Sequence, residues 1–187
     1  MKGLIERSIP FGLKPDLQQS PFEALIRAVA SQQLHGAASE AILGRFIKLV
    51  PGKAFPGPDD VEHLTDDQIR SAGFSRGKIL TLRDLTDKVR LGVVPSPDEI
   101  KLLDDDAIVA RITQVRGIGR WTVEMLLIFS LGRMDVLPAD DFGVRKGFMR
   151  AYGLPEMPKP KEILAHGERW RPYRTMASWY LWRAAYE

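Results

Sequence analysis

Residues 115–143 read VRGIGRWTVEMLLIFSLGRMDVLPADDFG, and this stretch decides how the chain folds. Gly117 and Gly119 flank a single isoleucine, and an apolar run follows from Trp121. Glycine adopts backbone conformations that are closed to residues with a Cβ, and it allows another backbone to come close. The pattern therefore predicts a helix that ends near Gln114, a tight hairpin, and a second helix that begins at Trp121.

The backbone N–H groups of this hairpin are the first candidate binding site. Those of Gly117, Gly119 and Arg120 are expected to point outward at the positive end of the second helix, where phosphate groups bind in other proteins. A plain turn between two packed helices is the alternative explanation. A dinucleotide-binding fingerprint is excluded, because no predicted strand precedes the hairpin and no third glycine follows at the required position.

The pair of aspartates at the end of the stretch is the second candidate site. Pro138 prevents the preceding helix from continuing, and either Asp140 or Asp141 can cap a new helix that begins near Phe142. A capping aspartate faces N–H donors and the positive end of the helix dipole, so it would be a fixed negative charge. A cap with no chemical role is the more common fate of such an aspartate.

The composition excludes several classes of protein and site. The chain has 187 residues and no cysteine, so we expect one domain of moderate size without disulfides, iron–sulfur clusters or thiolate zinc sites. The spacing of its three histidines is too wide to suggest a metal site. No apolar run approaches the roughly 20 residues of a membrane span, and the N-terminus lacks a signal-peptide core. A soluble cytoplasmic protein, or a nuclear one in a eukaryote, is expected.

Charge is distributed unevenly along the chain. Residues 51–110 hold 12 acidic and 8 basic side chains, whereas residues 111–187 hold 13 basic and 8 acidic ones, and the net charge is +3. A basic C-terminal part indicates an anionic partner such as nucleic acid, but an excess this small is also typical of an ordinary solvated surface.

Helix-start signals recur along the chain. In three capping boxes, Ser20–Glu23, Thr65–Gln68 and Ser96–Glu99, a hydroxyl can accept from the amide three residues on while the last side chain reaches back. Apolar residues recur at helical spacing and nothing alternates with period two, which predicts an all-α fold. The predicted helices cover residues 21–33, 36–50, 59–63, 66–72, 76–91, 97–102, 105–114, 121–131, 142–152, 160–169 and 172–185.

Taken together, these features resemble the helix-hairpin-helix (HhH-GPD) DNA glycosylase superfamily, and within it the 3-methyladenine DNA glycosylase II type. The resemblance runs from PFEALIRAVASQQLHGAA to RWRPYRTMASWYLWRAAY. It implies a compact all-α fold of two helical lobes, with the active site in the cleft between them and no N-terminal β domain. Residues 1–187 would form one such domain with its hairpin at 113–122. The N- and C-terminal segments would form one lobe, and residues from about 35 to 135 the other.

The resemblance also implies an activity. Asp141 matches the catalytic aspartate of the family, and Trp121 stands where bifunctional members carry a lysine nucleophile, which implies a monofunctional enzyme. Such an enzyme excises alkylated bases, such as 3-methyladenine or 7-methylguanine, from double-stranded DNA in base excision repair. An alkylated base is cationic and leaves readily, so the site needs a carboxylate for the charge that develops on the sugar and an aromatic surface for the base. We expect a monomer.

The remaining site residues follow from the same resemblance. Trp121, Met125 and Trp182 are expected in the base pocket. SQQLHG resembles an intercalation loop in which Gln33 fills the gap left by the extruded base, Leu34 supports it and His35 contacts the minor groove. The expected DNA contacts also include the hairpin residues Gly117, Ile118 and Gly119 and the basic side chains Arg116, Arg120, Arg145 and Lys146. No organic cofactor is implied, but Na⁺ or K⁺ can bind the backbone carbonyls of Thr113, Val115 and Ile118 in such hairpins.

Two other classes of protein remain as alternatives. A non-catalytic helix-hairpin-helix DNA-binding module would need the hairpin and the basic residues, but it has no use for a carboxylate in a pocket. A regulator with a helix-turn-helix would need a recognition helix with exposed polar residues, and WTVEMLLIFSL is too apolar to enter a major groove.

Overall fold

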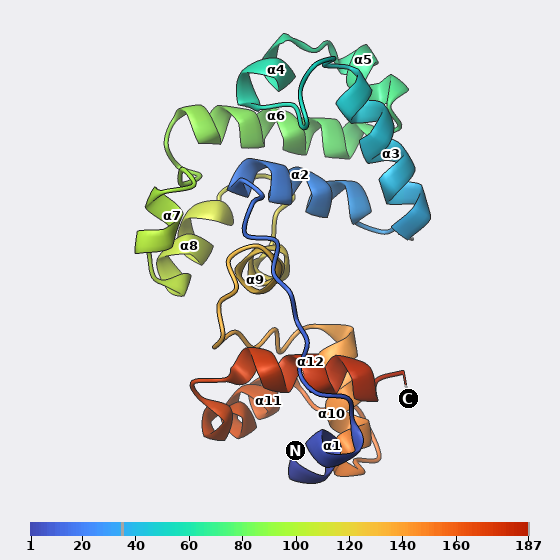
Figure 1. Ribbon diagram of the computed structural model, residues 1–187, viewed down its shortest axis with the longest axis vertical. Coiled ribbons are helices and arrows are strands. Elements are labelled where there is room, and N and C mark those ends of the chain that lie inside the picture. Colours follow the sequence, from blue (N-terminus) through green and yellow to red (C-terminus); the bar gives the residue numbers. More distant parts are fainter. Residues whose placement is uncertain (35, 187) are drawn as a thin grey trace. The chain divides into compact units, whose positions relative to one another are not determined.

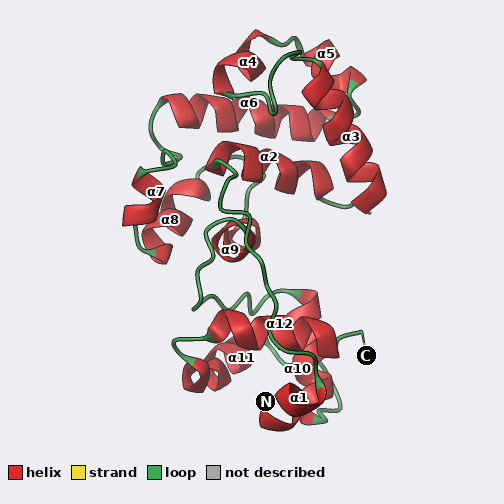
Figure 2. Cartoon of the chain, viewed as in Figure 1, coloured by secondary structure: helices red, strands yellow, loops and turns green. Residues whose placement is uncertain are grey.

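The computed structural model describes residues 1–34 and 36–186, and these residues form helices and loops without a strand (Figures 1 and 2). The all-α prediction is confirmed. None of the helices in this described part is long and apolar enough to cross a membrane. The helices are α1 (Lys2–Arg7), α2 (Pro21–Ser31), α3 (Gly36–Lys48), α4 (Pro58–His63), α5 (Asp66–Ser71), α6 (Arg76–Arg90), α7 (Glu99–Leu102), α8 (Asp105–Ile112), α9 (Arg120–Phe129), α10 (Phe142–Tyr152), α11 (Pro160–Gly167), the 3₁₀ turn η1 (Glu168–Trp170) and α12 (Arg174–Ala184).

The chain divides into two compact units. The terminal unit consists of Met1–Leu17 and Leu127–Glu187, and the middle unit consists of Gln18–Leu126. The boundaries expected from the resemblance, about 35 and 135, differ from this division at both ends. Helix α2 belongs to the middle unit because it packs against α3 and α6, and the loop after α9 belongs to the terminal unit.

Two of the three predicted capping boxes begin helices as expected. The Thr65 and Gln68 side chains bond to each other's backbone N–H groups, which forms the full box. The Ser20 hydroxyl caps α2 by accepting from the Glu23 N–H, but the Glu23 carboxylate pairs with Arg27, so only half of the box is formed. At the third box, the Ser96 hydroxyl accepts from the Glu99 N–H at 3.2 Å as predicted, but α7 begins only at Glu99, later than predicted. The Glu99 carboxylate pairs with Arg111 instead of reaching back to the start of the helix.

Helix α6 forms the centre of the middle unit and packs against α2, α4 and α5 (Figure 1). Its apolar face carries Ile79, Leu82 and Leu85, which are fully buried. Lys78 lies one helical turn before Leu82, and its half-buried side chain reaches the carbonyls at the end of α2. This arrangement brings the N-terminal turns of α6 beside the end of α2, where the predicted intercalation loop begins.

In the terminal unit, α10 packs closely against α12. A Cβ on Gly147 would lie 1.8 Å from the backbone oxygen of Leu181, so only glycine permits this approach. Helix α1 was not predicted, because its six residues carry no side-chain cap and no acidic first turn. It is stabilised by tertiary packing, since Leu4 is buried in the same core as α10 and α12.

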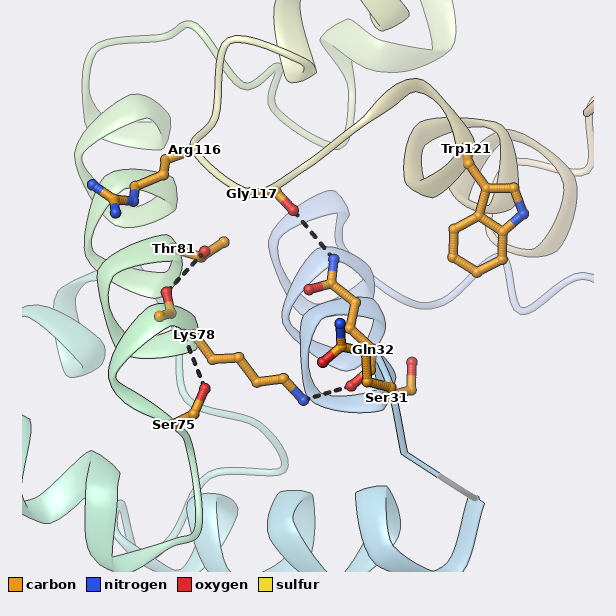
Figure 3. A pocket seen from close by; sticks show the side chains of 10 residues that line it. Ser31, Gln32, Ser75, Lys78, Thr81, Arg116, Gly117 and Trp121 are labelled. Atoms are coloured by element: carbon orange, nitrogen blue, oxygen red, sulfur yellow. Dashed lines mark hydrogen bonds between the residues drawn. The ribbon is translucent and has the colours of Figure 1, made fainter. Parts of the chain in front are cut away.

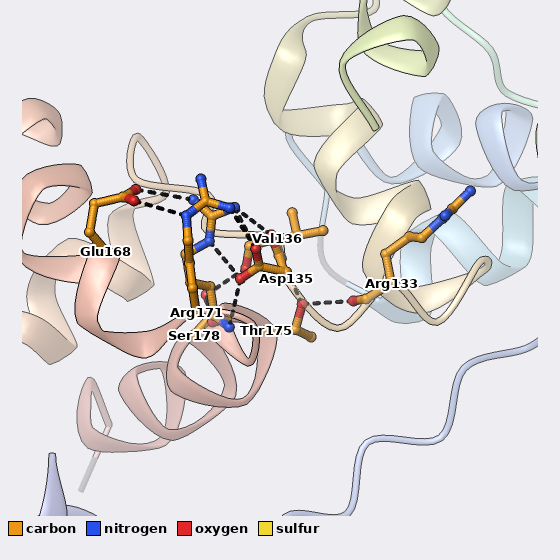
Figure 4. A network of polar contacts seen from close by, with 8 residues as sticks. Arg133, Asp135, Val136, Glu168, Arg171, Thr175 and Ser178 are labelled. Carbon is orange, nitrogen blue, oxygen red and sulfur yellow. Dashed lines mark hydrogen bonds and ion pairs between the residues drawn. The ribbon is translucent and has the colours of Figure 1, made fainter. Parts of the chain in front are cut away.

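The loop between α9 and α10 is fastened to α12 by an ion-pair network (Figure 4). The Asp135 carboxylate accepts from Nε of Arg174 at 2.7 Å and from Nη1 of Arg171 at 2.8 Å. The Thr175 hydroxyl donates to the Arg133 carbonyl at 2.7 Å. These bonds fix the course of the loop shortly before it reaches Asp141.

Candidate functional site

Asp141 caps α10, and its carboxylate is held by two N–H donors. Its Oδ1 accepts from the Val144 backbone N–H at 2.8 Å and from the indole Nε1–H of Trp182 at 2.7 Å. The predicted cap is therefore confirmed for Asp141, whereas the neighbouring Asp140 is exposed. Donors from α10 and α12 meet at one oxygen, so the position of the carboxylate is fixed by the packing of these two helices.

A glycine makes this arrangement possible. A Cβ on Gly143 would lie 2.8 Å from Cδ1 of Trp182 and 3.1 Å from Oδ1 of Asp141, so a larger residue would push the indole away from the carboxylate. The indole also stacks on Phe129, with ring centroids 5.7 Å apart and planes at 25°. The predicted pocket residue Trp182 is therefore a hydrogen-bond partner of the predicted catalytic residue, a contact that the sequence analysis did not foresee.

The basic residues that follow Asp141 differ in what they contact. The ammonium of Lys146 lies 6.0 Å from the ring centroid of Phe142 and 5.1 Å from that of Tyr186, and both rings are exposed. Lys146 thus lies at the surface beside the helix start that carries Asp141. Arg145 instead donates through Nε to the Pro158 carbonyl at 3.1 Å, so it holds a loop in place.

The predicted hairpin of residues 113–122 is present and rests on α6. Gly117 has a φ of +75°, and a Cβ there would lie 2.6 Å from Oγ1 of Thr81. The Arg116 backbone N–H donates to Oδ2 of Asp84 at 2.7 Å. Burial, the largest influence on Asp84, raises its pKa, but the N–H of Arg116 and the ammonium of Lys88 outweigh burial and hold the pKa below its usual value. Asp84 is a site residue that the sequence analysis missed.

The backbone of the hairpin is open to a ligand, but one of its arginines is engaged. Gly117 and Gly119 are exposed, and neither amide has a hydrogen-bond acceptor within the described ranges 1–34 and 36–186. Arg120 donates through Nε to the buried Glu124 at 3.0 Å and lies 3.9 Å from Asp106. These carboxylates offset part of the charge of the Arg120 side chain, which remains 60% exposed.

A cavity of about 710 Å³ lies beside the hairpin in the middle unit (Figure 3). It is lined by residues from the end of α2, the start of α6 and the hairpin, and Trp121 lies at its edge. The Gln32 side chain crosses it and donates through Nε2 to the Gly117 carbonyl at 3.2 Å. The loop after α2 and the hairpin, which are 85 positions apart in sequence, are therefore connected directly.

The predicted intercalation loop begins with a sharp turn after α2. The Leu34 N–H donates to the Ser31 carbonyl at 3.0 Å, and Gln33 has a φ of +59°. Gln33 and Leu34 are both exposed, which is compatible with contact to DNA. His35, the expected minor-groove contact, lies outside the described residues.

The three predicted base-pocket residues belong to two units. Trp121 and Met125 lie on the part of α9 that belongs to the middle unit, and the side chain of Trp121 is 44% exposed. Trp182 lies on α12 in the terminal unit. This exposure leaves part of the Trp121 indole accessible to a ligand.

The predicted cation site consists of three backbone oxygens of the hairpin. Such neutral oxygens suit a monovalent cation, and the Val115 carbonyl uses one of its two lone pairs to accept from the Ile118 N–H at 3.1 Å. Thr113 is half-buried directly after α8. The backbone carbonyl oxygens of Thr113, Val115 and Ile118 are thus ligands of the type that Na⁺ or K⁺ accepts. Within the described part of the chain, no group of three acidic, histidine or cysteine side chains could hold a metal ion.

Residues 26–172 match the family model of the HhH-GPD superfamily of base excision DNA repair proteins. The chain belongs to this superfamily. This HhH-GPD protein is 44% identical over 168 residues to the DNA-3-methyladenine glycosylase 1 of Schizosaccharomyces pombe, in an alignment that covers 90% of this chain and 74% of that relative. The resemblance inferred from the hairpin and the aspartate is therefore confirmed.

Two solved structures share the fold of this HhH-GPD protein over almost its whole length. A Schizosaccharomyces pombe 3-methyladenine DNA glycosylase in complex with abasic DNA matches with a TM-score of 0.85 and 41% identity, over 97% of this chain and 89% of that one. A DNA-3-methyladenine glycosidase from Bacillus halodurans matches with a TM-score of 0.86 and 35% identity, over 99% and 83%. The relatives are enzymes by name, which favours an enzyme over a binding module or a regulator.

Proposed function

We propose that this HhH-GPD protein is a monofunctional DNA glycosylase that hydrolyses the N-glycosidic bond of alkylated bases in double-stranded DNA, as a monomer, in base excision repair. The observation that carries the proposal is the carboxylate of Asp141, whose Oδ1 is held by the Val144 N–H and the Trp182 indole N–H. A plain helix cap needs only the first of these donors. The second fixes the carboxylate in a direction that capping does not require.

The chemistry of an alkylated base fits one well-placed carboxylate. A purine methylated at N3 or N7 carries a positive charge, and it leaves as a neutral base when the bond from its nitrogen to the sugar C1′ breaks with both electrons. Positive charge then develops on the sugar, and Asp141 stabilises it. A water oxygen bonds to C1′ and a proton is released, which completes the hydrolysis.

Aromatic surfaces supply the binding of the cationic base. The face of a tryptophan attracts a cation by roughly 0.5 to 2 kcal/mol. Trp121 presents an exposed indole, and Trp182 is fixed beside Asp141, so both suit this role, with Met125 as an adaptable neighbour. Because Trp121 has no amine, no Schiff base with the sugar forms at this position, and the enzyme stops at the abasic site.

The proposed DNA contacts are made mainly by the backbone and by the loop after α2. The exposed amides of Gly117 and Gly119, with Ile118 between them, bind a phosphate, and the hairpin carbonyls hold a monovalent cation next to it. Gln33 enters the duplex where the extruded base was, and Leu34 packs behind it. Lys146 approaches a phosphate near Asp141. Contacts of this kind position the enzyme and do not read a sequence.

The test is base release from alkylated duplex DNA by the wild type and by Asp141→Asn. The asparagine oxygen can accept the same two N–H bonds, and asparagine caps helices as well as aspartate does, so the variant is expected to fold normally. Losing the negative charge should slow release about 100-fold or more. Equal release by both proteins would refute the role of Asp141. DNA binding without any release by the wild type would favour the non-catalytic module.

The monofunctional assignment has a separate test. A Schiff base between an enzyme amine and an abasic sugar is reduced by borohydride to a stable covalent complex. Incubation of the wild type with abasic duplex DNA and borohydride is expected to give no such complex, while a known bifunctional glycosylase in parallel gives one. A trapped complex would mean that another amine of this chain acts as a nucleophile.

A further inference from the structure

The turn after α2 has a conformation that its sequence does not favour. Gln32 has a φ of −52° and a ψ of 126°, and Gln33 has a φ of +59°. The Leu34 N–H donates to the Ser31 carbonyl. These angles and this hydrogen bond define a type II turn. The third position of such a turn normally requires glycine or asparagine. Among residues 1–34 and 36–186, Gln33 is the only residue other than glycine with a positive φ.

Lys78 holds the peptide group that distinguishes this turn from its alternative. Type I and type II turns differ by a rotation of the central peptide, here the one between Gln32 and Gln33, which reverses the direction of the Gln32 carbonyl. The ammonium of Lys78 donates to that carbonyl at 2.9 Å and to the Ala30 carbonyl at 2.8 Å. A type I turn would withdraw the Gln32 oxygen from Lys78, so this bond favours the type II form.

Lys78 is half-buried where it makes these contacts. Figure 3 shows its side chain extending from α6 across the cavity to the end of α2. This partial burial lowers its pKa. The Gln32 side chain ties the same turn to the hairpin through the Gly117 carbonyl. The exposed Gln33 is therefore supported from α6 and from the hairpin before any DNA is bound.

We propose that Lys78 is a positioning residue for base extrusion, which holds the turn in its type II form so that Gln33 is already directed toward the duplex when DNA binds. This role rests on the proposed function. It differs from a phosphate contact, which is the usual role of a lysine in a DNA-binding protein, because both of its bonds go to backbone carbonyls of the protein. A turn that is already held in its bound form loses less conformational entropy when DNA binds.

The first experiment compares two substrates. Lys78→Met is assayed under single-turnover conditions on duplexes with the lesion in a normal pair and with the lesion opposite an abasic site, where extrusion costs less. We expect about a tenfold loss of rate on the paired lesion and less than a twofold loss opposite the abasic site. Lys101→Met removes the same charge from an exposed ion pair of the same unit, and its rates should match the wild type on both substrates.

The second experiment is a double-mutant cycle with Gln33→Ala. If Lys78 acts only through Gln33, then Lys78→Met should cause little further loss in the Gln33→Ala background. Lys78→Arg, which can still donate to two carbonyls, should recover part of the rate. The logarithm of the DNA-binding constant should keep its dependence on salt, because a lost phosphate contact would lower that slope by about 1.

Three results would overturn this role while leaving the proposed function intact. They are an equal loss on both substrates, an undiminished effect of Lys78→Met in the Gln33→Ala background, and a lower salt slope. The activity that remains opposite the abasic site also shows that the variant is folded. If the wild type releases no base from either substrate, the proposed function itself is refuted, and this role with it.

Discussion

The indole N–H of Trp182 and the backbone N–H of Val144 donate to the same oxygen of Asp141, at 2.7 and 2.8 Å. One donor belongs to α12 and the other to α10, and the two helices approach closely because Gly147 carries no side chain. The carboxylate is thus held at the junction of two helices within one unit. Its direction depends on a side chain that lies 41 positions further along the sequence.

Trp182→Phe is expected to slow base release without unfolding the protein. Phenylalanine keeps an aromatic ring against Phe129 but removes the donor to Asp141, and a hydrogen bond to a charged group contributes about 1.5 to 3 kcal/mol. If about 1.4 kcal/mol of this hydrogen-bond energy is lost in the transition state, the single-turnover rate should fall about tenfold. Trp179→Phe, on the same helix but packed against Phe11 and Tyr180, is the matched control and should retain its rate. An unchanged rate for Trp182→Phe would show that the indole N–H does not align the carboxylate.

Gly147→Ala should be among the most destabilising small changes in the terminal unit. The new methyl would lie 1.8 Å from the Leu181 backbone oxygen, so α10 and α12 would have to move apart, at a cost of about 2 to 3 kcal/mol or more. Gly44→Ala in α3 is the control, because a Cβ there meets nothing within 4 Å, and it should stabilise by up to about 1 kcal/mol. Urea unfolding of both variants measures the difference. Similar midpoints would mean that the helices adjust at little cost.

Asp84→Ala tests whether the hairpin must be held by α6. Removing a negative charge close to DNA should strengthen binding on electrostatic grounds. The substitution also removes the acceptor for the Arg116 N–H, which should loosen the hairpin. We expect this second effect to be the larger one and to weaken DNA binding about threefold to tenfold, since such a hydrogen bond contributes about 1 kcal/mol. Asp87→Ala removes the same charge from an exposed position on α6 and should bind as tightly as the wild type or more tightly. Fluorescence anisotropy at one salt concentration distinguishes these outcomes, and tighter binding by Asp84→Ala would exclude the anchoring role.

Local signals in the sequence predicted most helices and the residues at their ends. The capping box at Thr65, the hairpin glycines and the cap at Asp141 each depend on a few neighbouring residues, so they can be read directly. Helix α1 could not be predicted, because a helix of six residues without a cap forms only when Leu4 finds a core to pack in.

The contacts that complete the site could not be predicted from spacing alone. Trp182 donates to Asp141, and Lys78 donates to the Gln32 carbonyl. In each pair the two residues are far apart in sequence, and only the packing of their helices brings them together. A glutamine in the left-handed region gives no signal in the sequence, since glycine or asparagine would be expected there. The engagement of Arg120 by the buried Glu124 is a local contact at helical spacing, and it could have been foreseen.

Acid should destabilise the protein partly through Asp135. Burial, the largest influence, raises the pKa of this carboxyl, but hydrogen bonds from Arg174 and the charges of Arg174 and Arg171 outweigh burial and place the pKa below its ordinary value of 3.8. A lowered pKa in the folded state contributes stability that is fully present above the ordinary pKa and is lost as the pH falls through the folded pKa. The melting temperature should therefore decline below about pH 4, in part because the loop before Asp141 detaches from α12.

Asp135→Asn separates this contribution from those of the other carboxylates. The variant should melt at a lower temperature than the wild type at pH 7, because Arg174, whose side chain is only 14% exposed, loses the closer of its two charged partners and keeps only Glu168 at 3.7 Å. The difference between the two melting temperatures should shrink as the pH falls below 3.8, the ordinary pKa of the carboxyl, since folding then opposes protonation of Asp135. Asp67→Asn removes a carboxylate from an exposed ion pair with Arg70, and its melting temperature should equal that of the wild type at every pH. A difference between wild type and Asp135→Asn that stays constant from pH 7 to pH 3 would show that the ionisation of Asp135 does not contribute to stability.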